Sequence, residues 1–157
     1  MNHLTCCFTG HRLLPREKLP GITQRLSAQV DALIAQGVTR FLSGGALGFD
    51  QLAALVVLNK RENENKPVEL VIVQPCRDQS KAWNNQEKQL YENILSRADE
   101  VVCLSEHYFN GCMQIRNRYM VDHADYVIAC MARLQGGTAQ TVRHAVQKGL
   151  DVANVWE

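Results

Sequence analysis

Short apolar runs alternate with segments of helical periodicity along the whole chain. Six runs of four to six residues are short enough to be buried strands, and they cover 4–9, 38–43, 68–73, 101–104, 126–131 and 152–155. Between them, apolar residues recur every three or four positions, as they do on one face of a helix. Such alternation is typical of βαβ units, whose right-handed crossovers produce a doubly wound parallel sheet. We therefore expect an α/β fold with a mainly parallel sheet of about six strands and helices on both faces.

The predicted helices connect these strands in a Rossmann-like order. They cover 22–34, 50–58, 83–98, 113–120 and 139–148. Segment 59–67, Asn-Lys-Arg-Glu-Asn-Glu-Asn-Lys-Pro, is polar with mixed charges, which predicts a solvated loop. A chain of 157 residues has the size of one ordinary domain, so we expect a single Rossmann-like domain over 1–157.

Charge and cysteine content argue against several classes of function. There are 17 basic and 16 acidic residues, and this balance argues against nucleic acid as the main partner. The six cysteines are scattered without a CxxC pair, so we expect buried free thiols and no metal site. The N-terminus has no signal-peptide pattern and no apolar stretch approaches membrane-spanning length, which predicts a cytoplasmic protein without membrane contact.

Two glycine turns follow predicted strands and open predicted helices. They are 43–50, Ser-Gly-Gly-Ala-Leu-Gly-Phe-Asp, and 135–138, Gln-Gly-Gly-Thr. Doubly wound sheets bind ligands at the carboxyl ends of their strands, where a helix N-terminus presents free N–H groups to anions. Glycine lets a phosphate or ribose approach the backbone, and it serves equally well for a tight turn and close helix packing. Neither turn matches GxGxxG or GxxxxGK[ST], which argues against kinase or ATPase chemistry.

The candidate ligand-binding residues lie in these turns and in the loops of the same sheet edge. They are Gly10, His11, Arg12, Ser43, Gly44, Gly45, Gly48, Asp50, Arg116, Asn117, Gly136, Gly137 and Thr138. The planar guanidinium of Arg12 suits a phosphate. Asp50 either caps its helix or accepts a hydrogen bond from a ribose hydroxyl. One arginine of the pair Arg116 and Arg118 is expected to reach the ligand, and the sequence does not decide which.

Aromatic residues also follow strands at this edge. Trp83 and the loop residues Tyr108 and Phe109 are candidates for stacking on an adenine, and the two loop residues are equally candidates for a subunit interface.

Taken together, these motifs resemble the SLOG superfamily. The matching segments are Thr9-Gly10-His11-Arg12, 44–50, 116–125, and Gly136-Gly137-Thr138 followed by Thr141 and Ala145. Within the superfamily the chain resembles the YpsA-like (DUF1273) branch, and it is more distantly similar to DprA and to the lysine-decarboxylase-like LOG enzymes. The resemblance implies a Rossmann-like domain that binds a small nucleotide ligand of the ADP-ribose, NAD or AMP type. It also implies a homo-oligomer.

The same resemblance leaves enzymatic activity open. LOG-type phosphoribohydrolases carry a PGGxGTxxE pattern, and this chain has Gln135 in place of the proline and Thr141 in place of the glutamate. A hydroxyl group cannot replace that carboxylate near neutral pH, so no catalytic residue is assigned. Nucleotide binding or sensing is the favoured function. The alternatives are an N-glycoside hydrolase with a displaced acid (Asp50, Asp122 or Asp125) and a DprA-like binder of single-stranded DNA.

Overall fold

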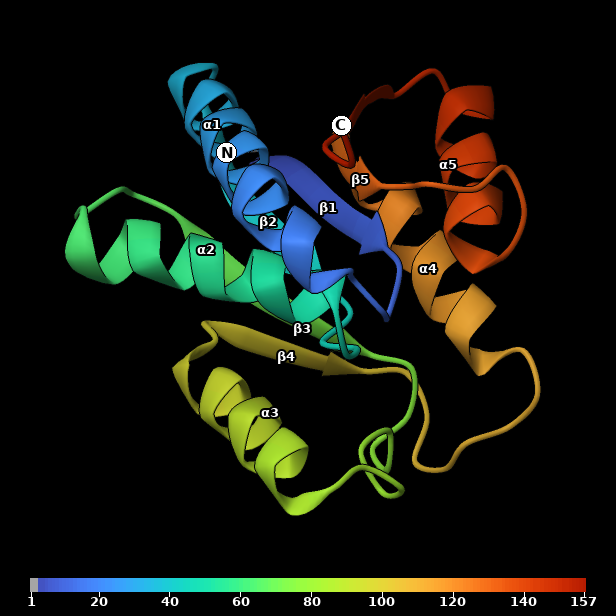
Figure 1. Cartoon of the computed structure of the whole chain (residues 1–157). Helices are drawn as coiled ribbons and strands as arrows, with labels where there is room; N and C mark the ends of the chain where they lie inside the picture. The colour runs from blue at the N-terminus through green and yellow to red at the C-terminus, as the bar shows by residue number, and fades with distance from the viewer. Residues whose placement is uncertain (1–2) are drawn as a thin grey trace.

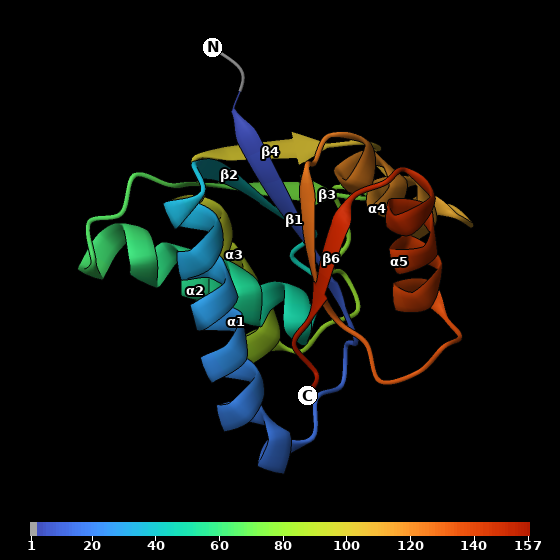
Figure 2. The same ribbon diagram turned by 90° about the horizontal axis from the view of Figure 1, so that it is seen from above.

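A computed structural model describes residues 3–157 as one six-stranded parallel sheet between two layers of helices (Figures 1 and 2). The sheet order is β4-β3-β2-β1-β5-β6. The strands are β1 (Leu4–Gly10), β2 (Val38–Ser43), β3 (Glu69–Gln74), β4 (Glu100–Cys103), β5 (Tyr126–Cys130) and β6 (Asp151–Asn154). The helices are η1 (Arg16–Lys18), α1 (Leu19–Ala35), α2 (Phe49–Asn63), α3 (Asn85–Arg97), α4 (Cys112–Asp122) and α5 (Gly137–Gln147). The predicted Rossmann-like fold class is confirmed.

The direction in which the chain builds the sheet reverses once. Strands β2, β3 and β4 follow one another on one side of β1. The chain then crosses back and places β5, followed by β6, on the other side of β1. Right-handed crossovers therefore put α1, α2 and α3 on one face and α4 and α5 on the other, as Figure 2 shows. The reversal makes the carboxyl ends of β1 and β5 the switch point of the sheet, where such folds bind ligands.

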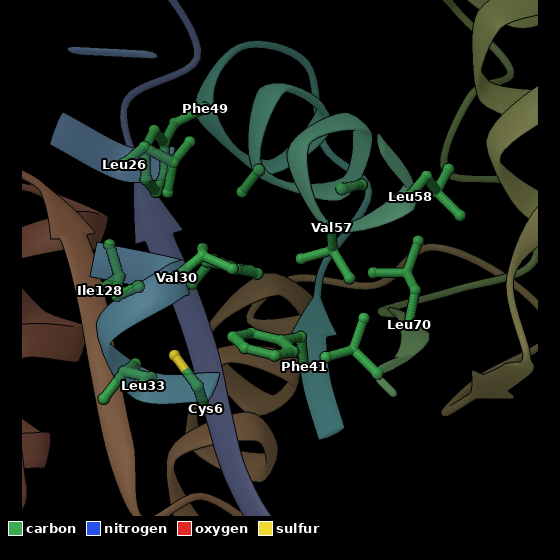
Figure 3. Close-up of a cluster of buried hydrophobic side chains, with 14 of the residues drawn as sticks. Cys6, Leu26, Val30, Leu33, Phe41, Phe49, Val57, Leu58, Leu70 and Ile128 are labelled. Atoms are coloured by element: carbon green, nitrogen blue, oxygen red, sulfur yellow. The ribbon is translucent and has the colours of Figure 1, made fainter. Parts of the chain in front are cut away.

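Apolar side chains alternate across the sheet and fill both layers. The larger core packs α1 and α2 against one face through residues such as Leu26, Val30, Phe41 and Leu58 (Figure 3). On β1, Cys6 belongs to this core and Cys7 to the opposite one, which includes Val127. Successive strand residues point to opposite faces, so one short strand serves two cores.

The prediction of a loop over residues 59–67 is wrong for its first half, because helix α2 continues to Asn63. The side chain of Lys60 is buried, and its Nζ lies 3.0 Å from Asp31 Oδ2 on α1 and 3.3 Å from Glu64 Oε2. Arg61 pairs with Asp99, which precedes β4. The mixed charges of this segment thus pair within the helix and with partners distant in sequence. A local reading of polarity does not reveal such partners.

Five of the six free cysteines are buried, and Cys103 is half-buried. Within residues 3–157 no helix has the length and apolar character needed to cross a membrane.

Candidate functional site

A cavity of about 550 Å³ opens at the switch point of the sheet. We call it the switch-point cavity; its lining residues are His11, Arg12, Leu13, Pro15, Ala132, Arg133, Gly137 and Trp156. The loops after β1 and β5 are tied together there, because the Ala132 N–H donates to His11 Nε2 at 2.9 Å. The volume falls in the range of small-molecule sites, about 300–1,000 Å³.

The walls of this cavity carry a net positive charge. Arg12 and Arg133 are exposed, and neither forms an ion pair with a carboxylate within residues 3–157. Burial and the nearby charge of Arg133 lower the pKa of His11, so its imidazole is neutral at pH 7. Because its Nε2 accepts a hydrogen bond, the proton of the neutral ring is on Nδ1. The unpaired charge therefore belongs to the two arginines.

Gly137 of the second glycine turn lines this cavity, and residues 135–137 of the turn are exposed to solvent. Gly136 is the N-cap of α5 with φ of 100°, and no side chain in the described part of the chain caps the helix. A Cβ at Gly136 or Gly137 would meet nothing within 4 Å. Thr138 follows in the first turn with its side chain buried. Within residues 3–157 no side chain accepts a hydrogen bond from the N-terminus of α5, and free N–H groups of this kind bind anions at helix N-termini.

The first glycine turn is instead filled by the protein itself. A Cβ at Gly44 would collide with Arg116 and Asp50, and one at Gly45 would lie 2.8 Å from Tyr91 Cε1. Gly48, with φ of 86°, packs against the backbone carbonyls of His11 and Arg12.

The glycine that ends β1 has a similar role. A Cβ at Gly10 would lie 2.5 Å from the ring of Phe49. Each of these four glycines thus lies so close to a specific neighbouring group that close packing alone, the alternative interpretation of such glycines, accounts for it. Their contact with a ligand stays a prediction.

Arg116 and Asp50 form a buried charged cluster behind this turn. They are 3% and 6% exposed. Arg116 Nη1 donates to the Gly44 carbonyl at 2.8 Å, and Ser43 Oγ donates to the Asp50 carbonyl and accepts from the Gly45 N–H. Burial raises the pKa of Asp50 to about 6, against the opposing effects of the Arg116 charge and the Ala46 N–H. The cluster holds the shape of the turn from inside.

The remaining residues of α4 lie elsewhere. Asn117 and Arg118 line a smaller cavity of about 90 Å³ between α4 and α5, together with Thr141 and His144. Neither Arg116 nor Arg118 lines the switch-point cavity. Thr141, at the position of the LOG glutamate, donates from Oγ1 to the Gly137 carbonyl.

The other two candidate acids are already hydrogen-bonded. Asp122 Oδ1 accepts from His144 Nε2 and Lys148 Nζ, each at 2.9 Å. Asp125 Oδ2 accepts from the Thr5 N–H at 2.9 Å. With Asp50 buried, none of the three carboxylates lines the switch-point cavity.

A second cavity of about 490 Å³ lies on the other side of Arg12. We call it the outer cavity; the loops after β3 and β4 contribute most of its lining, which comprises Arg12, Asp78, Gln79, Lys81, Ala82, Trp83, His107, Tyr108 and Met113. Arg12 is the residue that the linings of these two cavities share.

Comparison with known proteins identifies the family of this chain. The model of the YpsA family, described as the YspA SLOG family, matches residues 14–154. The chain belongs to this SLOG family. The predicted family resemblance is therefore confirmed.

Relatives of this SLOG chain include two bacterial proteins. The SPbeta prophage-derived protein YoqJ of Bacillus subtilis is 28% identical over 137 residues, which are 79% of this chain and 80% of YoqJ. A UPF0398 protein of Bacillus pumilus is 33% identical over 110 residues, which are 69% of this chain and 59% of that protein. The chain thus spans little more than half of the second relative.

Two solved structures share the fold at low sequence identity. DNA processing protein A of Helicobacter pylori, described by its single-stranded DNA binding mode, has a TM-score of 0.66 and 23% identity, covering 95% of this chain and 63% of that one. The molybdenum cofactor binding protein of Rippkaea orientalis has a TM-score of 0.60 and 16% identity, covering 97% and 76%. At these identities the likeness concerns the fold alone.

The sequence predicted some of the residues that line the switch-point cavity of the SLOG chain and missed others. His11, Arg12 and Gly137 were predicted and line one cavity. Trp156 and Arg133 were missed. Trp156 follows the last strand and lies edge-on to His11, with ring centroids 6.2 Å apart. Arg133 sits in the loop after β5, so the rule that ligands lie at strand carboxyl ends was a signal that would have found it.

Proposed function

We propose that this protein binds a nucleotide or nucleotide derivative in the switch-point cavity. The observation that carries the proposal is the exposed glycine N-terminus of α5, which lines the cavity beside Arg12 and Arg133; among residues 3–157 no side chain caps this helix and no carboxylate pairs with either arginine. A phosphate suits this position, because it accepts hydrogen bonds from the first helical turn and from guanidinium groups at the same time. The base would then lie against Trp156.

The geometry supports binding more than hydrolysis. Asp50, Asp122 and Asp125 are each held by protein donors or buried behind the glycine turn. An acid or base for cleavage of an N-glycosidic bond must reach the substrate within hydrogen-bond distance. We therefore expect AMP to remain intact on long incubation, as followed by chromatography of free adenine. Adenine release that Asp50→Asn abolishes would instead establish the hydrolase.

The binding test compares ligands with and without phosphate. Calorimetric titration with AMP, ADP-ribose and NAD is expected to give binding, with adenosine at least tenfold weaker, since each charge-assisted hydrogen bond contributes about 1.5–3 kcal/mol. A single-stranded oligonucleotide is included because a structural relative is described as binding single-stranded DNA.

A substitution in the helix N-terminus tests the position of the phosphate. Gly137→Asp places a carboxylate where the anion would bind, and it is compatible with folding because acidic residues stabilise a helix N-terminus. Binding should fall by more than tenfold. Gln147→Asp, which adds the same charge at the other end of α5, is the matched control and should bind normally. Unchanged binding by Gly137→Asp, or no response of the wild type to any nucleotide, would reject the proposal.

A further inference from the structure

Hydrogen bonds between two loops fix the shape of the outer cavity. Asp78 Oδ1 accepts from the Tyr108 N–H at 3.1 Å, and the Arg77 N–H donates to the Ser105 carbonyl at 2.8 Å. These bonds tie the loop after β3 to the loop after β4. The two loops therefore hold opposite walls of the cavity in a fixed relation.

The outer cavity has two aromatic side chains: Trp83 packs against the residues beneath it, and Tyr108 is exposed to solvent. Trp83 packs edge-to-face on Tyr91 with ring centroids 5.1 Å apart, and the Tyr91 hydroxyl accepts from Gln74 Nε2 and Gln79 Nε2, each at 3.0 Å. Tyr91 fills the space that Gly45 leaves, so the first glycine turn supports the position of Trp83. Tyr108, in contrast, is 60% exposed. A held ring facing a cavity beside a free ring suits a planar aromatic ligand group.

The charged residues of the outer cavity favour a ligand whose aromatic ring is attached to a phosphate group. Arg12 and Lys81 form no ion pair within residues 3–157, whereas Asp78, the one carboxylate of the lining, accepts from the Tyr108 N–H and has His107 Nδ1 3.8 Å from its other oxygen. Gln79 is 8% exposed, and its Nε2 donates to the Gly44 carbonyl at 3.2 Å and to the Tyr91 hydroxyl at 3.0 Å, so it fixes the wall behind Trp83. Arg12 and Lys81 are the groups of this cavity that suit a phosphate next to the ring.

We infer that the outer cavity is a second ring subsite, so that the ligand is a dinucleotide-type molecule whose bridging phosphates cross Arg12. One ring-bearing half occupies the switch-point cavity, and the other ring lies between Trp83 and Tyr108. Each cavity, at about 550 and 490 Å³, is of a size for one nucleotide-sized group. The inference rests on the proposed function, because it needs the first half of the ligand to bind at α5.

The two tryptophans of the chain make the test direct, since one lines each cavity. Trp83→Phe leaves Trp156 as the reporter of the switch-point cavity, and Trp156→Phe leaves Trp83 as the reporter of the outer cavity. Both variants are titrated with ADP and with diadenosine diphosphate, which has the same number of phosphates and one more adenine. ADP should quench only Trp156, whereas diadenosine diphosphate should quench both.

Affinity gives an independent measurement. The wild type should bind diadenosine diphosphate at least tenfold more tightly than ADP, although ADP carries more negative charge, because stacking of one base contributes about 1–3 kcal/mol in nucleic-acid sites. Tyr108→Ala should bring this ratio close to one and leave ADP binding unchanged. Phe109→Ala is the matched control, because Phe109 is an exposed neighbour that lines neither cavity.

The outcomes separate the two proposals. If neither nucleotide binds, the proposed function fails and the inference fails with it. If ADP binds while Trp83 stays silent and the affinity ratio is one, only the second subsite is rejected. If Trp83 responds to a single-stranded oligonucleotide that binds more tightly than diadenosine diphosphate, a nucleic-acid strand occupies the cavity and the inference is overturned.

Discussion

At the scale of single residues, the buried cluster of Arg116 and Asp50 has a measurable effect on stability. Arg116→Leu leaves the carboxyl of Asp50 buried without its main countercharge, since Arg12 has the smaller effect, and removes one of the two side-chain donors to the Gly44 carbonyl. We expect a loss of about 3 kcal/mol in the free energy of unfolding at pH 8. The loss should be smaller at pH 5, because the variant raises the pKa of Asp50 further and the carboxyl is then neutral. Denaturant unfolding at both pH values measures it.

Arg118→Leu is the matched control for this variant. Arg118 lies on the same helix but is exposed, so its replacement should change stability by about 0.5 kcal/mol or less. An equal loss for Arg116→Leu at pH 5 and pH 8 would show that Asp50 is not the group affected.

The pKa of Asp50 also predicts a pH dependence in the wild-type protein. Its folded value of about 6 lies above the unfolded value of 3.8, so the folded state holds this proton more tightly. The stabilisation is complete below the unfolded value and is lost as pH rises through the folded one. The stability difference between wild type and Asp50→Asn should fall by about 3 kcal/mol from pH 3.8 to pH 6 and stay level above it. A flat difference, measured by calorimetry, would contradict this assignment.

At the scale of elements, the contact between the start of α2 and the loop after β1 joins the two parts of the site. Gly48 and Gly149 both have positive φ, at 86° and 81°, but only Gly48 would bring a Cβ against neighbouring backbone. Gly149→Ala should therefore cost only the strain of the left-handed conformation, about 1–2 kcal/mol. Gly48→Ala should cost more than this and also weaken nucleotide binding. Equal losses, with normal binding by both variants, would mean that the contact does not position His11 and Arg12.

Elements were more predictable from the sequence than side-chain environments. Strand β2 has the predicted bounds, 38–43, because a short apolar run between a glycine stop and a glycine turn has few alternatives. The extension of α2 was missed because the partners of Lys60 and Arg61 include Asp31 and Asp99, which are remote in sequence. Periodicity does not encode such pairs.

In the candidate site, too, the positions of the loops were predictable from the sequence and the environments of the side chains were not. The loops after β1 and β5 were predicted, since parallel strands bring their carboxyl ends to one edge. The burial of Arg116 was not, because a charged residue on a helix is usually solvated and only the tertiary structure supplies its acceptor, the Gly44 carbonyl.

At the scale of the whole molecule, ligand binding should raise thermal stability. A ligand at one hundred times its dissociation constant stabilises the folded state by about 2.7 kcal/mol. For a chain of this size that corresponds to a rise in Tm of about 5–10 °C. Differential scanning calorimetry with AMP should show the rise, and adenosine at the same concentration should show much less. Equal shifts with both compounds would argue against a phosphate contact.

The ladder between β1 and β5 has a consequence for the order of folding. It pairs Cys6 with Tyr126, so it closes a far longer loop than the β1–β2 ladder, in which Cys6 pairs with Phe41. Contacts so distant along the chain carry the largest loop-closure entropy and tend to form late. A ligand bound across this ladder would stabilise interactions absent from the folding transition state. It should then slow unfolding while leaving the folding rate nearly unchanged, and so act as a kinetic lock on the native state.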